Sequence, residues 1–226
     1  QGLVQFDPAS AEVRPALAAS WRADPTLRRW TFELAPGRRF HDGTAVDAAA
    51  VVASFARQLD PRAPGHRDGC GAGNPALANI TTVRAVDART VEFTLAAPSA
   101  TFIDALVVPA AYVVSPTALQ RGAATLATAP DGTGPYRLAA WIPGQRLVLE
   151  AAPTAASPVP WFARVTFEVE RDPRQRLVAL ESGAADLAVG VVPDDQAYVT
   201  LHPGLQLHVI ATDGIAYLAM NQLRPP

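Results

Sequence analysis

The sequence contains no lysine, one cysteine (Cys70) and one methionine among its 226 residues. All 19 basic residues are therefore arginines, and with 21 acidic residues they give a formal net charge of −2. The arginines are scattered, which argues against the basic surface that nucleic-acid backbones require, so we expect no nucleic-acid partner. A single cysteine cannot form an internal disulfide bond, so cysteine pairing says nothing about the redox compartment.

Long apolar runs are also missing. No run approaches the roughly 20 residues that are needed to span a bilayer. The chain opens with Gln1-Gly2-Leu3-Val4, which does not resemble a signal peptide. Hydrophobic residues nevertheless make up 49% of the chain, which is typical of an ordered globular protein with one large core or two small ones.

The most informative stretch runs from Trp30 to Leu59. Residues 30–34 alternate large apolar with polar side chains, the pattern of a half-buried strand. Pro36-Gly37 and Asp42-Gly43 then predict two turns. From Ala48 the apolar residues recur at helical spacing, and Asp47 is placed to cap the first turn of a helix.

The rest of the chain reads as short strands and helices. Asp87-Ala88-Arg89 and Pro143-Gly144 each predict the connection of a hairpin. We expect helices over residues 99–106, 173–182 and 193–201, the first capped by Ser99. Alternating apolar residues predict strands over 3–6, 80–86, 90–95, 106–108, 112–114, 136–142, 146–151, 165–169, 186–189, 205–210 and 215–221.

Six segments occur in a recognisable order along the chain. They are PALAASW (15–21), WTF with FHDGT (30–44), TVEFTL (90–95), GTGPY (132–136), LESGAAD (180–186) and YLAMN (217–221). Together they resemble the family 5 extracellular solute-binding proteins, the peptide- and nickel-binding receptors of ABC importers. Residues Ala48-Ala49-Ala50 depart from the family pattern, which commonly has acidic residues there.

The resemblance implies a fold of the α/β class with helices and strands mixed. It would be the first lobe of a class II periplasmic-binding-protein-like receptor, with a mixed β-sheet and flanking helices. Residues 1–43 and 133–226 would form a sheet-centred subdomain, and residues 44–132 an inserted smaller subdomain. The second lobe is absent from this sequence, so we expect the chain to be a fragment that covers roughly the first half of a receptor.

The function that the resemblance implies is the capture of oligopeptides or dipeptides between two lobes and their delivery to a membrane permease. It implies an extracytoplasmic protein, in the periplasm or lipid-anchored at the outer face of the cell membrane, monomeric and without a cofactor. Nickel chelates, opines, sugars and other small solutes remain open as ligands. The residues that would lie beside the ligand are Leu3, Val4, Gln5, Pro109, Ala110, Tyr112, Val191, Val192, Tyr217 and Asn221.

A metal site is the sharpest competing hypothesis that the residues themselves offer. His66, Asp68 and Cys70 supply three potential ligands within five residues. A structural zinc site usually needs four ligands, and the remaining histidines lie in unrelated segments. We therefore expect a solvated loop and no metal.

Catalysis and ligand sensing are two further functions that the sequence could support. His41-Asp42 has the composition of an acid–base pair, but a turn at Asp42-Gly43 explains it, and the chain has no Gly-x-Ser-x-Gly motif. Asp194-Asp195 follow Pro193 at an expected helix start. Their favourable interaction with the helix dipole explains two adjacent carboxylates there without catalysis. We expect no enzyme. A ligand-sensing domain of a transcriptional regulator has the same fold and remains open.

Overall fold

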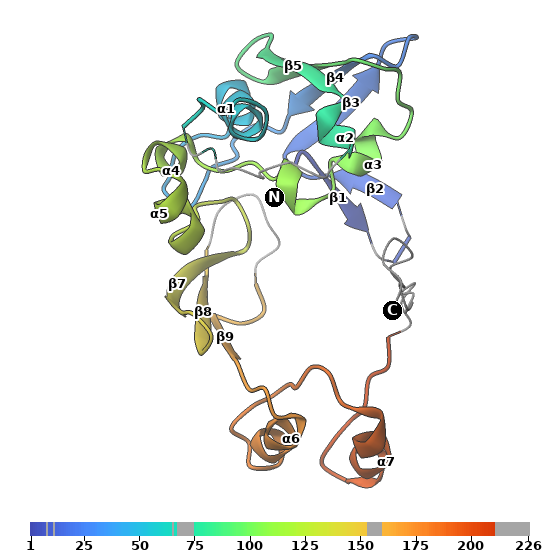
Figure 1. Ribbon diagram of the computed structural model, residues 1–226, viewed down its shortest axis with the longest axis vertical. Helices are drawn as coiled ribbons and strands as arrows, with labels where there is room; N and C mark the ends of the chain where they lie inside the picture. The colour runs from blue at the N-terminus through green and yellow to red at the C-terminus, as the bar shows by residue number, and fades with distance from the viewer. Residues whose placement is uncertain (8, 11, 65, 67–74, 153–159, 211–226) are drawn as a thin grey trace, which may run out of the picture. The chain divides into compact units, whose positions relative to one another are not determined.

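The computed structural model describes residues 1–7, 9–10, 12–64, 66, 75–152 and 160–210. The chain divides into two compact units, unit 1 (Gln1–Glu168) and unit 2 (Val169–Pro226), each of which is described by itself. Figure 1 labels the helices and strands of both. Every strand pair among the described residues is antiparallel.

Four strands of unit 1 form one sheet in the order β3-β4-β6-β5. Central strand β4 buries Trp30, Phe32 and Leu34, which confirms the predicted alternation. The predicted hairpin of β5 and β6 is confirmed, and the Asp87 carboxylate accepts the Arg89 N–H at 2.7 Å in the connection. The strands are β3 (Ala18–Ala23), β4 (Arg29–Leu34), β5 (Ile80–Ala85) and β6 (Thr90–Leu95).

Helix α1 (Ala48–Leu59) begins at the residue that the sequence predicts. Asp47 is its N-cap, and the carboxylate accepts the N–H of Ala50 at 2.8 Å. The first turn contains no acidic residue, so Asp47 caps the helix without the partner of a capping box. The helix packs against β5 and β6, in front of the sheet in Figure 1.

An aromatic cluster fills the space between α1 and the sheet. Phe93 of β6 lies at its centre, with ring centroids 5.3 Å from Phe32, 4.9 Å from Phe55 and 5.6 Å from Phe102. All four rings are at most 1% exposed. Because these rings come from two strands and two helices, the cluster holds the whole layer together.

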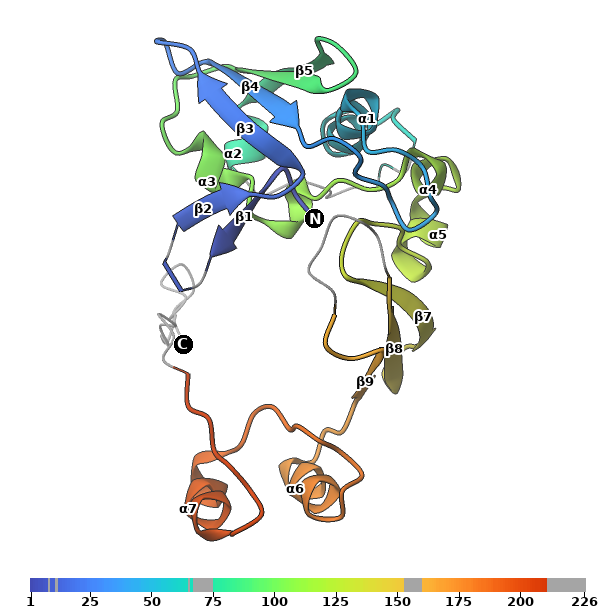
Figure 2. The same ribbon diagram turned by 180° about the vertical axis from the view of Figure 1, so that it is seen from behind.

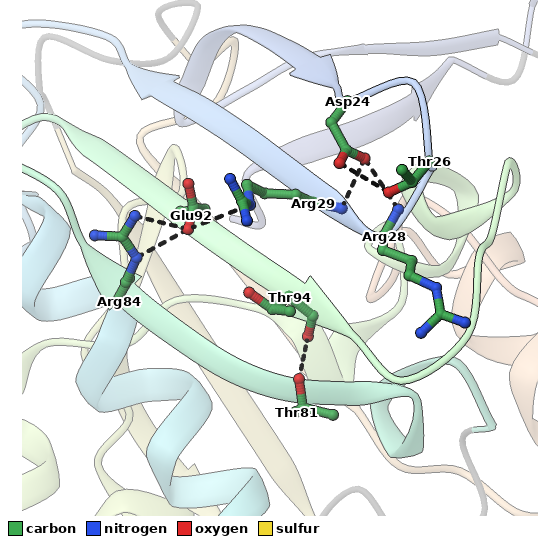
Figure 3. Close-up of polar contacts among 8 residues, drawn as sticks. All are labelled: Asp24, Thr26, Arg28, Arg29, Thr81, Arg84, Glu92 and Thr94. Carbon is green, nitrogen blue, oxygen red and sulfur yellow. Dashed lines mark hydrogen bonds and ion pairs between the residues drawn. The ribbon is translucent and has the colours of Figure 1, made fainter.

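The opposite face of this sheet is polar and faces the viewer in Figure 2. The Glu92 carboxylate accepts from the Arg84 guanidinium at 2.8 Å and lies 3.9 Å from Arg29 (Figure 3). The Thr81 hydroxyl donates to the Thr94 carbonyl at 3.0 Å. The sheet therefore has one buried apolar face and one face of paired charges and hydroxyls.

Short elements complete this part of unit 1. Strands β1 (Val4–Asp7) and β2 (Glu12–Pro15) form a separate two-stranded sheet. The remaining helices are α2 (Pro75–Ala78), α3 (Phe102–Ala105), the 3₁₀ helix η1 (Pro109–Ala111), α4 (Pro116–Gln120) and α5 (Ala123–Thr128). No helix in the described part of the chain is both long and apolar enough to cross a membrane.

A second, three-stranded sheet in unit 1 has the order β7-β8-β9. Its strands are β7 (Tyr136–Ile142), β8 (Arg146–Ala151) and β9 (Arg164–Glu168). The predicted hairpin at Pro143-Gly144 is confirmed: Ile142 pairs with Arg146, and Gly144 has a φ of 73°, which favours glycine. This sheet leaves large side chains exposed, among them Trp141 (44%) and Phe167 (53%).

Unit 2 contains helices α6 (Pro173–Glu181) and α7 (Pro193–Leu201), both as predicted. The Asp172 carboxylate caps α6 by accepting the Arg174 N–H at 2.9 Å. The Tyr198 hydroxyl of α7 donates to the Glu181 carboxylate of α6 at 2.6 Å, and this hydrogen bond raises the pKa of Tyr198. The link joins the two helices of this unit.

Several predicted strands are wrong. Residues 106–108 and 112–114 flank η1 and form no strand, because Pro109 begins a 3₁₀ turn between them. Residues 186–189 and 205–210 are not strands either. The predicted cap at Ser99 is also wrong, since α3 begins after Thr101, whose side chain makes no capping hydrogen bond. The predicted strand 215–221 lies outside the described residues.

The predicted division into subdomains stays a prediction. Strands β3 and β4 precede residue 44, and β5 and β6 follow it, yet the four strands form one hydrogen-bonded sheet. Strands from both sides of the predicted subdomain boundary at residue 44 therefore belong to one sheet.

Candidate functional site

Strand β1 has a strand partner on one of its two edges among the described residues. It pairs with β2 on one side, with Val4 opposite Pro15, and no other described strand pairs with it. Because Pro15 has no N–H, the Val4–Pro15 pair is at a non-hydrogen-bonded position, which directs the N–H and C=O of Val4 away from β2. Leu3, one residue earlier, instead accepts the Ala16 N–H at 3.2 Å.

The side chains of this strand do not all face solvent. Leu3 and Val4 are 0% exposed and belong to the hydrophobic core, whereas Gln5 is exposed. These fractions count main-chain atoms too, so Val4 offers neither its side chain nor its main chain to a solute, and Gln5 is the accessible residue of the three.

The loop around η1 lies next to the start of β1. The Val113 N–H donates to the Gln1 carbonyl at 3.0 Å. A Cβ built on Gly2 would lie 3.2 Å from the Leu106 carbonyl oxygen and 3.5 Å from Cδ1 of Tyr112. The structure thus brings together two segments that are about 100 residues apart in the sequence.

The residues that this loop contributes differ in exposure. Pro109 is exposed, Ala110 is half-buried, and Tyr112 is 44% exposed. The predicted site residues 3–5 and 109–112 are therefore neighbours, with Tyr112 the largest accessible side chain among them. Their contact with a solute stays a prediction.

The remaining predicted site residues lie elsewhere. Val191 and Val192 are half-buried in unit 2, immediately before α7. Tyr217 and Asn221 lie outside the described residues. The structure thus places six of the ten predicted residues together in unit 1.

His41 and Asp42 belong to a hydrogen-bonded cluster with Thr44 and Ser115, and not to a catalytic arrangement. The His41 ring Nε2 lies 2.8 Å from the Gly134 carbonyl oxygen. The Asp42 carboxylate accepts from the hydroxyls of Ser115 and Thr44, and from the Thr44 N–H at 2.8 Å. The serine hydroxyl is directed at the carboxylate and the imidazole at a carbonyl, so the three groups do not form a nucleophile–base–acid relay.

This hydrogen-bonded cluster also contains a second carboxylate that sequence reasoning did not identify. Asp131 accepts the Asp42 N–H at 3.2 Å and lies 3.9 Å from the Arg121 guanidinium. Burial, followed by the negative charge of Asp42, raises the pKa of Asp131. Burial alone would raise the pKa of Asp42 as well, but the hydrogen bonds from Ser115 and Thr44 outweigh it and lower that pKa. The turn residues at 130–132 are the one local signal for this region.

A pocket of about 430 Å³ lies in unit 1, away from β1 and the η1 loop in sequence. Its walls are mostly apolar, with Trp141 of β7 and Leu147 and Leu149 of β8 on one side. His41 and Arg137 also line it, although Arg137 lies 3.6 Å from the Glu150 carboxylate. Sequence reasoning did not identify this pocket, because its lining residues come from four separate segments.

No metal centre is found in the part of the chain that the structure describes. That part contains no group of three or more histidine, cysteine, aspartate or glutamate residues placed to hold an ion. Of the three residues in the metal hypothesis, the His66 ring Nδ1 lies 2.8 Å from the Arg57 carbonyl oxygen. Asp68 and Cys70 lie outside the described residues.

Two curated proteins illustrate what the chain is similar to. It is 32% identical over 235 residues to the probable D,D-dipeptide-binding periplasmic protein DdpA of Escherichia coli K12, covering 100% of this chain and 44% of that protein. It is 31% identical over 229 residues to the glutathione-binding protein GsiB of Pectobacterium atrosepticum, covering 100% of this chain and 43% of that protein. The chain thus spans less than half the length of these relatives.

A solved structure supports the same relationship. The periplasmic binding protein DppA of Helicobacter pylori, in complex with the peptide STSA, matches with a TM-score of 0.81 and 27% identity over 89% of this chain and 43% of that one. This match confirms the predicted fold class, a lobe of a class II periplasmic binding protein. The family model of the bacterial extracellular solute-binding proteins, family 5 (middle), matches residues 12–226. The chain therefore belongs to family 5 of the bacterial extracellular solute-binding proteins.

Proposed function

We propose that the complete protein is the extracytoplasmic substrate-binding component of an ABC importer and that it binds dipeptides or short oligopeptides. The observation that carries the proposal is the match over 89% of this chain to a peptide-bound receptor, together with a dipeptide-binding relative that is 32% identical. The protein performs no catalysis in this proposal. It delivers its solute to a membrane permease and acts as a monomer.

The accessible residues near β1 support a peptide as the solute. Gln5 is exposed, and its side-chain amide can donate to and accept from the main chain of a peptide. The exposed ring of Tyr112 would cover part of the peptide. Val191, Val192, Tyr217 and Asn221 are proposed as further contacts, and the second lobe as the opposite wall of the site.

A thermal-shift screen of the complete protein tests this function. The panel contains D-alanyl-D-alanine, L-alanyl-L-alanine, glutathione and a nickel–histidine chelate. A ligand that binds the native state at 100 times its dissociation constant stabilises it by about 2.7 kcal/mol, so a cognate peptide raises the melting temperature. A shift with the nickel chelate alone, or with no member of the panel, would contradict the peptide proposal.

Two matched variants locate the site once a ligand is found. Tyr112 and Trp141 are both 44% exposed, but Tyr112 lies beside β1 and Trp141 lines the apolar pocket. We expect Tyr112→Ala to weaken binding of that ligand about tenfold, an amount typical of one removed aromatic contact. Trp141→Ala should leave affinity unchanged. The reverse result would move the site to the pocket.

A further inference from the structure

Arg176 of α6 makes an unusual set of contacts within unit 2. Its guanidinium donates to the Glu170 carbonyl at 3.0 Å and to the Arg171 carbonyl at 3.4 Å through one nitrogen. Its other terminal nitrogen donates to the Gly190 carbonyl at 2.9 Å. One side chain thus joins the segment before α6 to the segment before α7.

The loop that Arg176 reaches has few other attachments. Among the described residues, the backbone hydrogen bonds of this region end where Ala185 donates to Ala179 and resume at Val192. Leu187 and Val189 are 75% and 77% exposed, so apolar burial in unit 2 does not hold them. In the described part of the chain, the bond to the Gly190 carbonyl is thus the one hydrogen bond that attaches the loop of residues 187–192 to α6.

The chemistry of the guanidinium suits this task. It is planar, always charged and rigid, so two of its nitrogens can donate in fixed directions to separate carbonyls. Hydrogen bonds from an ionised donor are about twice as strong as neutral ones. Gly190 has a φ of 78°, a conformation that glycine adopts without strain, and a Cβ at this position would lie 3.6 Å from Nη2 of Arg176.

We propose that Arg176 is a positioning residue that fixes the loop of residues 187–192 in one conformation, so that Val191 and Val192 are presented to a bound peptide. The inference rests on the proposed function, which places these two valines beside the solute. A loop that is already ordered loses less conformational entropy on binding, and affinity rises accordingly. Arg176 itself need not touch the peptide.

The test compares Arg176→Ala, Arg176→Lys and Arg174→Ala in the complete protein. Arg174 lies on the same helix and is exposed, and the structure records a capping bond to its backbone N–H but none from its guanidinium to a described residue, so it controls for the loss of one charge. Lysine keeps the charge of Arg176 but has a single nitrogen on a flexible stem, where the guanidinium has two nitrogens held in fixed directions.

Two readouts are measured on each variant. Backbone amide order parameters of residues 187–192 without ligand, from ¹⁵N relaxation, should fall below about 0.6 in Arg176→Ala, fall less in Arg176→Lys and stay unchanged in Arg174→Ala. The dissociation constant for whichever of D-alanyl-D-alanine, L-alanyl-L-alanine or glutathione shifts the wild-type melting temperature should rise about tenfold in Arg176→Ala. It should rise less in Arg176→Lys and stay within twofold in Arg174→Ala.

The two readouts separate the possible failures. Unchanged order parameters of the loop in Arg176→Ala, or a lysine variant that behaves as wild type, would overturn the positioning role. Lower order parameters with an unchanged dissociation constant would mean that the residue is structural alone, and would also overturn it. If the wild type binds none of the three peptides, the proposed function fails, and with it the presentation of the valines to a peptide. The order parameters then report separately whether Arg176 holds the loop.

Discussion

The two larger sheets of unit 1 are built from similar strands but are covered differently. The sheet β3-β4-β6-β5 has α1 on one face and buries four phenylalanine rings between them. The sheet β7-β8-β9 exposes Trp141 at 44% and Phe167 at 53%. Each sheet also carries a glutamate between two arginines, Glu92 in the first and Glu150 in the second.

The difference shows which part of the chain is stabilised by its own buried apolar side chains. Burial of apolar area is the main favourable term in folding, so the first sheet with α1 is a self-sufficient core. The second sheet leaves several of its large apolar side chains exposed and therefore gains less stability from burial. Four sets of substitutions test this account, in order of decreasing expected effect.

The largest expected effect is that of Phe93→Ala in the first sheet. Removing a ring that contacts three other buried rings should lower the free energy of unfolding by about 3–5 kcal/mol. Phe167→Ala in the second sheet should lower it by about 0.5 kcal/mol, as for an exposed site. Urea denaturation of the 226-residue chain measures both. Equal losses would show that the two sheets are equally well packed.

Asp47→Ala tests the helix that covers the first sheet. The carboxylate caps α1 without an acidic partner in the first turn, so its loss should cost about 1 kcal/mol of unfolding free energy. Asp47→Asn keeps an oxygen that accepts the Ala50 N–H and should cost at most a few tenths of a kcal/mol. Thermal unfolding compares the two. A cost of Asp47→Asn equal to that of the alanine variant would show that capping is not what Asp47 contributes.

Glu92 and Glu150, which each lie between two arginines, differ in how far they are exposed. The Glu92 side chain is 12% exposed and that of Glu150 is 32% exposed. Glu92→Gln should therefore cost about 0.5 kcal/mol, within the range of partly exposed ion pairs, and Glu150→Gln less. Both costs should shrink in 1 M salt, where charges are screened within about 3 Å. A larger loss in Glu150→Gln, measured by urea denaturation, would contradict the ranking.

The smallest effect is expected from Asp131→Asn and depends on pH. Because the pKa of Asp131 is raised by folding, its ionised form opposes folding above that pKa, and the opposition disappears as the pH falls to the ordinary aspartate value. The asparagine variant should thus be slightly more stable than wild type at pH 7 and lose this advantage near pH 4. Urea midpoints at the two pH values measure it. A variant that is less stable at pH 7 would show that the Arg121 pair dominates.

The elements that were predicted correctly are those with a complete local signal. Asp47 followed by apolar residues at helical spacing defines α1, and Asp87-Ala88-Arg89 defines the β5–β6 hairpin. The alternation of apolar and polar residues wrongly predicted strands at residues 186–189 and 205–210. A strand also needs a partner strand, and local sequence does not show whether one is present. At residues 106–114, Pro109 began a 3₁₀ turn within an apolar run.

The candidate site could be predicted less completely from the sequence than the fold could. Nothing in the local sequence shows that Leu3 and Val4 are fully buried while Gln5 beside them is exposed. The Val113 N–H donates to the Gln1 carbonyl and the Ser115 hydroxyl donates to the Asp42 carboxylate, which joins residues 112 and 73 positions apart. Such long-range contacts follow from the fold and leave no local pattern.

Calorimetric titration measures whether this chain supplies one wall of a peptide site between two lobes. The complete protein and the 226-residue chain are each titrated with the dipeptide that gives the largest thermal shift. We expect saturable binding of one peptide by the complete protein and at least tenfold weaker binding by the 226-residue chain, which lacks half of the contacts. Equal affinity of the two would contradict the two-lobe account.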